Sequence, residues 1–125
     1  MTSKEEKDIK EWASVWHSLI LAKNEAKEMY HYIEWYEQGF YASNPLLRVV
    51  NIMLLYGEKS TLAALNILFE EHVIKFETYL ALLDKICDKD LFSHHRNIEM
   101  LNQVYLKFLE IKERYYSNEK IDFKL

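Results

Sequence analysis

The chain has 125 residues, the size of one domain, and its two glycines and one proline are too few for the turns of an all-β sandwich, a Rossmann unit or a phosphate-binding loop. Its content of 50% hydrophobic residues excludes a disordered chain, because such chains are poor in hydrophobic and aromatic side chains. The net charge of −4 disfavours nucleic acid as the main partner, since binding to phosphates normally requires a basic face. These limits leave an all-α protein with a single domain over residues 1–125.

The first predicted helix begins at Ser3, where the spacing Ser3-x-x-Glu6 forms a capping box, and runs to about Gln38. Gly39 and the segment 43–45 end it. Apolar residues at helical spacing predict its buried face, which comprises Trp12, Val15, Leu19, Ala22, Ala26, Met29, Ile33, Tyr36 and Phe40. The seven-residue repeat within this series predicts near-parallel helix packing with a left-handed supercoil.

The second predicted helix is short, from Pro45 to about Tyr56, and it stops at Gly57. Its apolar residues cover nearly every face, which predicts burial on all sides. A third helix is predicted from after Ser60 to about Cys87. Its buried face is predicted to comprise Leu65, Phe69, His72, Phe76, Leu80, Leu83 and Cys87.

The fourth predicted helix starts after Asp90 or Ser93 and ends near Tyr116, followed by a polar tail over residues 117–125. Its buried face is predicted to comprise Ile98, Leu101, Val104, Tyr105, Phe108, Ile111 and Tyr115. Together the four segments predict a helical bundle of three long amphipathic helices plus one short buried helix.

A second series on the first predicted helix follows the same seven-residue spacing on another side and includes His17, Leu21, Glu28, His31 and Trp35. A solvated face would more often carry Lys and Glu, and tryptophan is enriched where proteins bind one another. We therefore predict that these five residues bind a partner. The alternative is that the second helix and the corner at Phe40 cover this series within the same subunit.

The third predicted helix also has a second apolar series, formed by Ala63, Ile67, Ile74 and Ala81. A bundle helix needs one buried face, so a second one implies either a central position or a subunit interface. These residues are the candidate interface of a homodimer, and coverage within one subunit is the alternative.

No complete metal site or cofactor site can be assembled from the sequence. The pair Glu28-x-x-His31 matches half of the ligand set of ferritin-like di-iron proteins, but no second copy of that motif exists. The spacing of His95 and Glu99 resembles hemerythrin-like proteins without their second histidine pair. We therefore predict no metal, no cofactor and no catalytic residues, and thus a protein that is not an enzyme.

Two side chains within the predicted core stripes have more than one interpretation. His72 is predicted to be a neutral core histidine, with a pH-sensitive core as the alternative, and His94 would share its layer. Cys87 faces the core stripe and is predicted to be a buried structural thiol rather than a nucleophile.

The segment His17-Ser18-Leu19 resembles the start of the histidine phosphotransfer motif, in which an exposed histidine lies on a four-helix bundle of about this length. That resemblance implies a signalling role for His17. The motif continues with a basic residue and a small residue that give phosphate room, whereas this chain has Ile20 and Leu21.

The remaining features concern compartment and charge. Cys87 is the only cysteine, so no disulfide can form within the chain. The first eight residues lack the apolar core of a signal peptide, and the most apolar stretch, 46–56, is shorter than the about 20 residues of a membrane span. We therefore expect a cytoplasmic protein. Lysine outnumbers arginine thirteen to three, which is typical of a low-GC bacterium or its phage. Residues 25–77 carry eight acidic against four basic residues, which indicates either a surface for a basic partner or ordinary solvated helix faces.

These observations favour a non-enzymatic, cytoplasmic protein-interaction module that binds another protein, of the inhibitor, immunity or phage anti-defence type, or as a subunit of an assembly. A homodimer is one form of this hypothesis. The alternatives are a histidine phosphotransfer-like domain that uses His17 and a nucleic-acid-associated helical protein. The second alternative would use the basic residues of the last predicted helix, which are Arg96, Lys107, Lys112 and Arg114.

Overall fold

The computed structural model describes residues 3–40, 44–88 and 98–119, and of residues 3–9 it describes only the helical backbone. Within these ranges every regular element is a helix, so the predicted all-α class is confirmed for the described residues. The helices are α1 (Ser3–Glu37), α2 (Pro45–Tyr56), α3 (Glu58–Glu71), α4 (Phe76–Ile86) and α6 (Ile98–Tyr115).

The first two helices, α1 and α2, begin and end close to the predicted residues. Proline and glycine at their ends explain why. Pro45 occupies the first turn of α2, where its missing N–H leaves no hydrogen bond unmade. Gly39 follows α1 with φ of 92°, and Gly57 joins α2 directly to α3 with φ of 91°. Both values lie in the left-handed region that glycine adopts without the steric cost that a Cβ atom brings.

The single third helix predicted over residues 60–87 is wrong, because the chain forms α3 and α4 with a break between them. His72 and Lys75 have extended backbone angles at the two ends of this break. Hydrogen bonds from other parts of the molecule replace the helical ones: Glu37 Oε2 accepts from the Lys75 backbone N–H at 3.0 Å, and the Tyr116 hydroxyl donates to the Ile74 carbonyl at 2.6 Å. The break turns α4 back so that it packs against α2 and α6.

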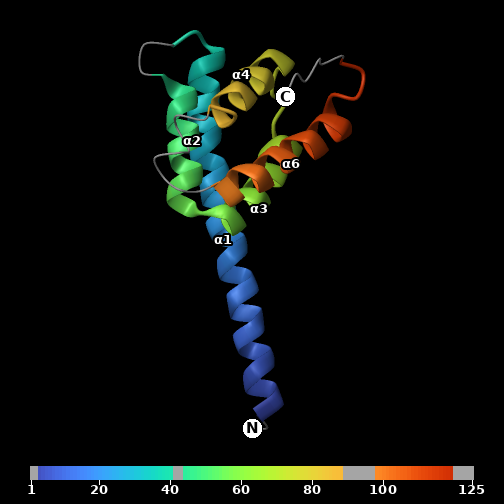
Figure 1. The fold of residues 1–125 in the computed structure, drawn as a ribbon. Coiled ribbons are helices and arrows are strands. Elements are labelled where there is room, and N and C mark those ends of the chain that lie inside the picture. Colours follow the sequence, from blue (N-terminus) through green and yellow to red (C-terminus); the bar gives the residue numbers. More distant parts are fainter. Residues whose placement is uncertain (1–2, 41–43, 89–97, 120–125) are drawn as a thin grey trace.

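The core lies around the C-terminal half of α1, which α2 and α3 flank (Figure 1). The predicted core positions that are confirmed as buried are Ala22, Ala26, Met29, Ile33, Leu65, Phe69, Leu83, Val104, Phe108 and Ile111. On the side of α4 and α6, Tyr79 is fully buried and its hydroxyl donates to the Phe108 carbonyl at 2.8 Å. The rings of Phe69, Tyr79 and Phe108 meet edge to face or tilted, which are favourable aromatic geometries.

Several other predicted core positions are wrong, because their side chains are exposed. They are Trp12, Val15, Leu19, Phe40, Cys87, Ile98 and Tyr115. The first three share one cause: the N-terminal half of α1 projects beyond the bundle as a single helix, drawn in blue in Figure 1. We call residues 3–21 of α1 the arm. Tyr36, His72, Phe76, Leu80, Leu101 and Tyr105 are partly buried.

Candidate functional site

All five predicted partner-binding residues lie on α1 and are exposed, but they fall on two parts of it. His17 and Leu21 belong to the arm. Glu28, His31 and Trp35 follow along the half of α1 that α2 flanks, and Trp35 is 38% exposed. At 1.5 Å per residue, His17 and Trp35 are about 27 Å apart along the helix axis. The structure therefore brings together the last three residues, and the first two lie elsewhere.

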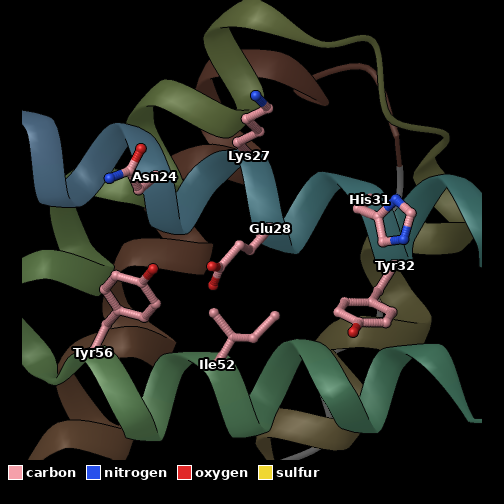
Figure 2. A pocket seen from close by; sticks show the side chains of 7 residues that line it. All are labelled: Asn24, Lys27, Glu28, His31, Tyr32, Ile52 and Tyr56. Atoms are coloured by element: carbon pink, nitrogen blue, oxygen red, sulfur yellow. The ribbon is translucent and has the colours of Figure 1, made fainter.

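A groove of about 620 Å³ runs between α1 and α2 beside these three residues (Figure 2). Its lining includes Glu28 and His31 from α1, and Ile52 and Tyr56 from α2. Figure 2 shows the Glu28 carboxylate pointing across the groove toward Tyr56 and Ile52. Desolvation raises the pKa of Tyr56, and the hydrogen bond that its hydroxyl makes with Glu28 raises this pKa further. Lys27 also lines the groove, but its side chain is directed away from the Glu28 carboxylate (Figure 2), so the centre of the groove is acidic and its floor at Ile52 is apolar.

A second groove of about 450 Å³ continues the first, because Tyr32 and Ile52 line both. Its other lining side chains come from α2 and the residue before it, and they include Arg48 and Leu55. Leu55 is 82% exposed, so the prediction that this short helix is buried on all sides is wrong: its side away from α1 and α4 faces solvent. We call the two grooves and the aromatic residues beside them the α1–α2 face.

Trp35 is the centre of an aromatic cluster at the end of this face. Its ring centroid lies 5.1 Å from that of His31, 5.9 Å from that of Tyr32 and 6.5 Å from that of Phe40. The Arg48 guanidinium lies 5.5 Å from the Tyr32 ring centroid, within the range of a cation–π contact. These contacts hold the indole in a defined position while much of it faces solvent, which is the state of a preorganised binding residue.

Glu25 and Glu37, two of the eight acidic residues in segment 25–77, accept hydrogen bonds from other parts of the molecule. Glu25 is completely buried, and the Thr61 hydroxyl donates to its Oε2 at 2.6 Å. Burial raises the pKa of Glu25 to about 7, and the hydrogen bond from Thr61 offsets some of that shift. Glu37 accepts from the Lys75 backbone and from the Thr78 hydroxyl, so it holds the start of α4. These two carboxylates are structural and are not available to a basic partner.

The predicted homodimer series does not form a continuous stripe, because the break between α3 and α4 divides it. Ala63 is exposed and Ile67 is partly buried on α3, while Ala81 is partly buried on α4. Ile74 lies within the break and is only 4% exposed, so it belongs to the core of its own subunit. Of this series, Ala63 alone is well placed to meet another molecule.

The other residues considered for chemistry are engaged elsewhere or differ from expectation. His72 is partly buried at the end of α3, where its ring stacks on Tyr30 with centroids 3.6 Å apart. Cys87 is exposed at the end of α4 instead of buried, and partial desolvation with the nearby Asp84 carboxylate raises its pKa. A raised pKa leaves less of the reactive thiolate at neutral pH.

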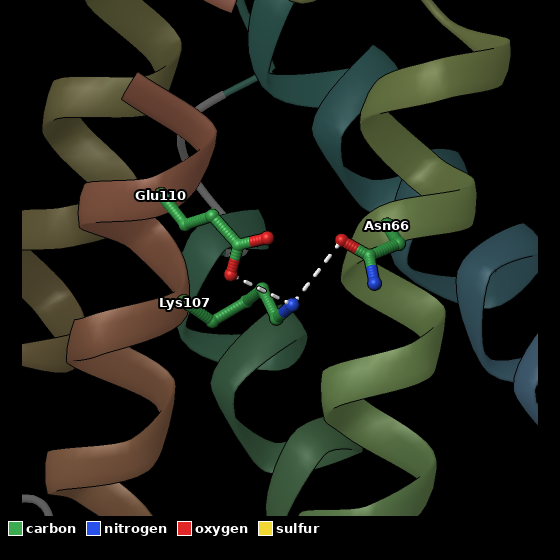
Figure 3. Close-up of polar contacts among 3 residues, drawn as sticks. All are labelled: Asn66, Lys107 and Glu110. Carbon is green, nitrogen blue, oxygen red and sulfur yellow. Dashed lines mark hydrogen bonds and ion pairs between the residues drawn. The ribbon is translucent and has the colours of Figure 1, made fainter. Parts of the chain in front are cut away.

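No group of three or more His, Cys, Asp or Glu side chains in the described ranges could hold a metal ion. His94, His95 and Arg96 lie outside the described residues. Lys107, one of the basic residues considered for nucleic acid, contacts its own chain: its Nζ lies 3.0 Å from Glu110 Oε2 and 3.4 Å from Asn66 Oδ1 (Figure 3). It therefore links α6 to α3.

The sequence reasoning missed the exposed residues that surround the predicted ones. Trp16 and Ile20 were assigned to neither series of the first helix, yet both are exposed on the arm. Phe40 and Arg48 belong to the α1–α2 face through their contacts with Trp35 and Tyr32. The available signal was the presence of Trp16 outside the core series, since an unassigned tryptophan is rarely left in solvent without a role.

Comparisons with family models, with curated proteins and with solved structures each give no match for this chain. No helix in the part of the chain that the structure describes is both long enough and apolar enough to cross a membrane.

Proposed function

We propose that this protein is a non-enzymatic, cytoplasmic interaction module that binds another protein through its α1–α2 face. The observation that carries the proposal is the exposure of Trp35 beside two continuous grooves, with His31, Tyr32 and Phe40 holding its ring. An inhibitor, an immunity or anti-defence protein, and a subunit of a larger assembly would all act through such a surface.

The chemistry of the face defines the partner segment that it fits. The groove floor at Ile52 and the exposed Leu55 favour an apolar side chain, and Trp35 supplies a large flat surface at little entropic cost. Glu28 stands in the middle of the first groove and favours a lysine or arginine in the partner. We therefore expect a segment that combines an apolar anchor with a basic residue.

Capture of cytosolic proteins on the immobilised full chain tests this proposal. Wild type is compared with Trp35→Ala and Glu28→Lys, and Trp12→Ala is the matched control because it removes an exposed tryptophan from the arm. We expect one protein to be held in stoichiometric amount by wild type and by Trp12→Ala, and lost from both face variants. If the same proteins are captured by wild type, Trp35→Ala and Glu28→Lys, the assignment of this face is wrong.

The two alternatives gain no support from the contacts of the described residues. His17 lies on the arm outside the bundle, whereas the phosphotransfer resemblance implies a histidine on the side of a four-helix bundle. Lys107 is paired with Glu110, and the nearby Asn66 takes a second hydrogen bond from it. We therefore propose neither phosphotransfer nor nucleic-acid binding.

A further inference from the structure

Three helices meet at the hydroxyl of Thr61, which lies in the first turn of α3. Its Oγ1 is 2.6 Å from Glu25 Oε2 on α1 and 3.2 Å from the carbonyl oxygen of Met53 on α2. All three residues are completely buried, so bulk water does not complete their hydrogen bonds. The bonds that this one hydroxyl makes therefore decide how α1, α2 and α3 are joined at this point.

The Thr61 hydroxyl has one proton to donate but two neighbouring acceptors. If Glu25 is ionised, Thr61 donates to the carboxylate, and the Met53 carbonyl receives nothing from Thr61. If Glu25 is protonated, its O–H donates to Thr61, and Thr61 donates to Met53. The Gly57 N–H also donates to the Met53 carbonyl, at 2.9 Å, so this carbonyl keeps one partner in either state. Protonation thus adds one hydrogen bond, and that bond joins α3 to the end of α2.

The immediate surroundings of Glu25 favour its protonated form. The second carboxyl oxygen, Oε1, is buried and has no hydrogen-bond partner among the described residues. Ionisation would place negative charge on an oxygen that neither solvent nor a donor stabilises. Burial accordingly raises the pKa of Glu25 to about 7, so the carboxyl changes its state near neutral pH.

The titratable groups on the three helices do not oppose this state. Glu28, one turn further along α1, has a like charge and disfavours ionisation of Glu25. Desolvation raises the pKa of Tyr56, at the end of α2, so its hydroxyl is uncharged at neutral pH. In the first turn of α3, Glu58 is another acid, and Lys59 is exposed where solvent screens its charge. None of these groups is a buried cation that would hold Glu25 ionised.

We propose that Glu25 is a proton-dependent link between the helices. With the carboxyl protonated, the hydrogen bonds through Thr61 join the last turn of α2 to α1 and α3. When the carboxyl ionises, Thr61 donates to Glu25 instead, and the bond to α2 is lost. The same turn of α2 holds Tyr56, whose hydroxyl bonds to Glu28 in the first groove (Figure 2). The α1–α2 face is thus more firmly held in acid than in alkaline solution, and the consequence for binding rests on the proposed function of that face.

The two glycines of the chain make this link observable by NMR of the full-length protein. The Gly57 amide shares the Met53 carbonyl with Thr61, so its ¹H and ¹⁵N shifts should change with a midpoint near pH 7. Glu25→Gln should abolish this change, because its side-chain amide can donate to Thr61 at every pH. Thr61→Ser keeps the hydroxyl and should retain the change. The Gly39 amide, which follows α1, is the matched control and should respond alike in wild type and Glu25→Gln.

Either of two shift results overturns the proposal. They are a Gly57 signal that stays constant between pH 5 and 9 in wild type, and one that changes identically in Glu25→Gln. Loss of the bond to α2 is measured by the ¹⁵N order parameters of residues 53–57. These should fall between pH 6 and 8 in wild type and stay constant in Glu25→Gln, and constant values in wild type would show that α2 is not released. Neither measurement involves a partner, so a failed link leaves the proposed function intact, and failed capture of a partner leaves the link intact.

Discussion

The two halves of α1 have the same apolar spacing but different surroundings. In the C-terminal half, small and medium side chains such as Ala22, Ala26 and Ile33 are buried against α2 and α3. In the arm, Trp12 and Trp16 occupy the corresponding side and face solvent. Helical spacing therefore identifies which side of a helix is apolar, but not whether its own chain or another molecule covers it. Small residues permit close helix approach within the subunit, whereas the large side chains of Trp12 and Trp16 are exposed on the arm.

The largest difference between the halves should appear in core truncations. Met29→Ala removes a completely buried side chain from the C-terminal half, and we expect it to lower the free energy of unfolding by about 2–5 kcal/mol. Trp12→Ala removes a larger side chain from the arm, yet we expect a change within about 0.5 kcal/mol in the monomer. Urea unfolding of both variants, at a concentration where the protein is monomeric, measures this. Equal losses would mean that the arm packs against its own bundle.

The buried carboxyl of Glu25 should make the body of the molecule sensitive to pH. Its pKa is about 7 in the folded protein against an ordinary value of 4.5, so folding favours the protonated form. The contribution of Glu25 to the free energy of unfolding is therefore fully present below pH 4.5. It is lost as the pH rises through 7, and the total decrease in the free energy of unfolding is about 3 kcal/mol. When protonated, the carboxyl can donate to Thr61, whose hydroxyl then donates to the Met53 carbonyl, 3.2 Å away.

Unfolding free energies between pH 4 and 8 for wild type and Glu25→Gln test this prediction. The amide keeps the size of the carboxyl and its acceptor oxygen but cannot ionise, so the variant should lose most of the decline in stability above pH 4.5. Glu11→Gln, at an exposed position on the arm, is the matched control and should keep the wild-type decline. A Glu25→Gln variant with the wild-type pH dependence would contradict the assignment.

The hydrogen bonds of Glu37 should have a smaller effect, and that effect should be local. Glu37→Ala removes the acceptor of two hydrogen bonds that hold the start of α4, and we expect a loss of about 2 kcal/mol in unfolding free energy. Glu34→Ala, one turn earlier on the exposed side, should change stability by less than about 0.5 kcal/mol. Thermal unfolding of the two variants distinguishes them. If Glu34→Ala costs as much as Glu37→Ala, the break between α3 and α4 is held by other contacts.

The smallest expected effect concerns the ion pair between α6 residues. Lys107→Met should lower stability by less than about 1 kcal/mol, because its partner Glu110 is largely solvent-exposed and solvent screens the pair. Raising the salt concentration should reduce even this loss. A loss above about 2 kcal/mol would show that the contact with Asn66 is essential for holding α6 on α3.

Local signals in the sequence predicted some elements correctly and could not predict others. Pro45, Gly39 and Gly57 set helix ends through their own backbone preferences, so the bounds of α1 and α2 could be read directly. The break between α3 and α4 could not, because the apolar spacing from Leu65 to Leu83 continues across it at helical period. Contacts with Glu37 and with Tyr116, both far away in sequence, stabilise the break instead.

The sequence likewise predicted part of the candidate site: it indicated which side chains of α1 are exposed, but not the grooves beside them. Exposure of His31 and Trp35 followed from their position off the core stripe. The grooves did not follow, because they depend on how α2 lies beside α1 and on Ile52 and Tyr56, which a one-helix pattern does not reveal. Glu25 lay next to the apolar series, and nothing in the local sequence distinguished this buried carboxyl from the exposed Glu28.

The C-terminal half of α1 is stabilised by packing against α2 and α3, whereas the described side chains of the arm, except that of Ser18, are exposed. Amide hydrogen exchange, resolved along α1 in dilute protein, measures the two halves in one experiment. We expect slow exchange over residues 22–37 and fast exchange over residues 10–21. Exchange over residues 10–21 that is as slow as that over residues 22–37 would show that the arm is protected like the rest of the helix.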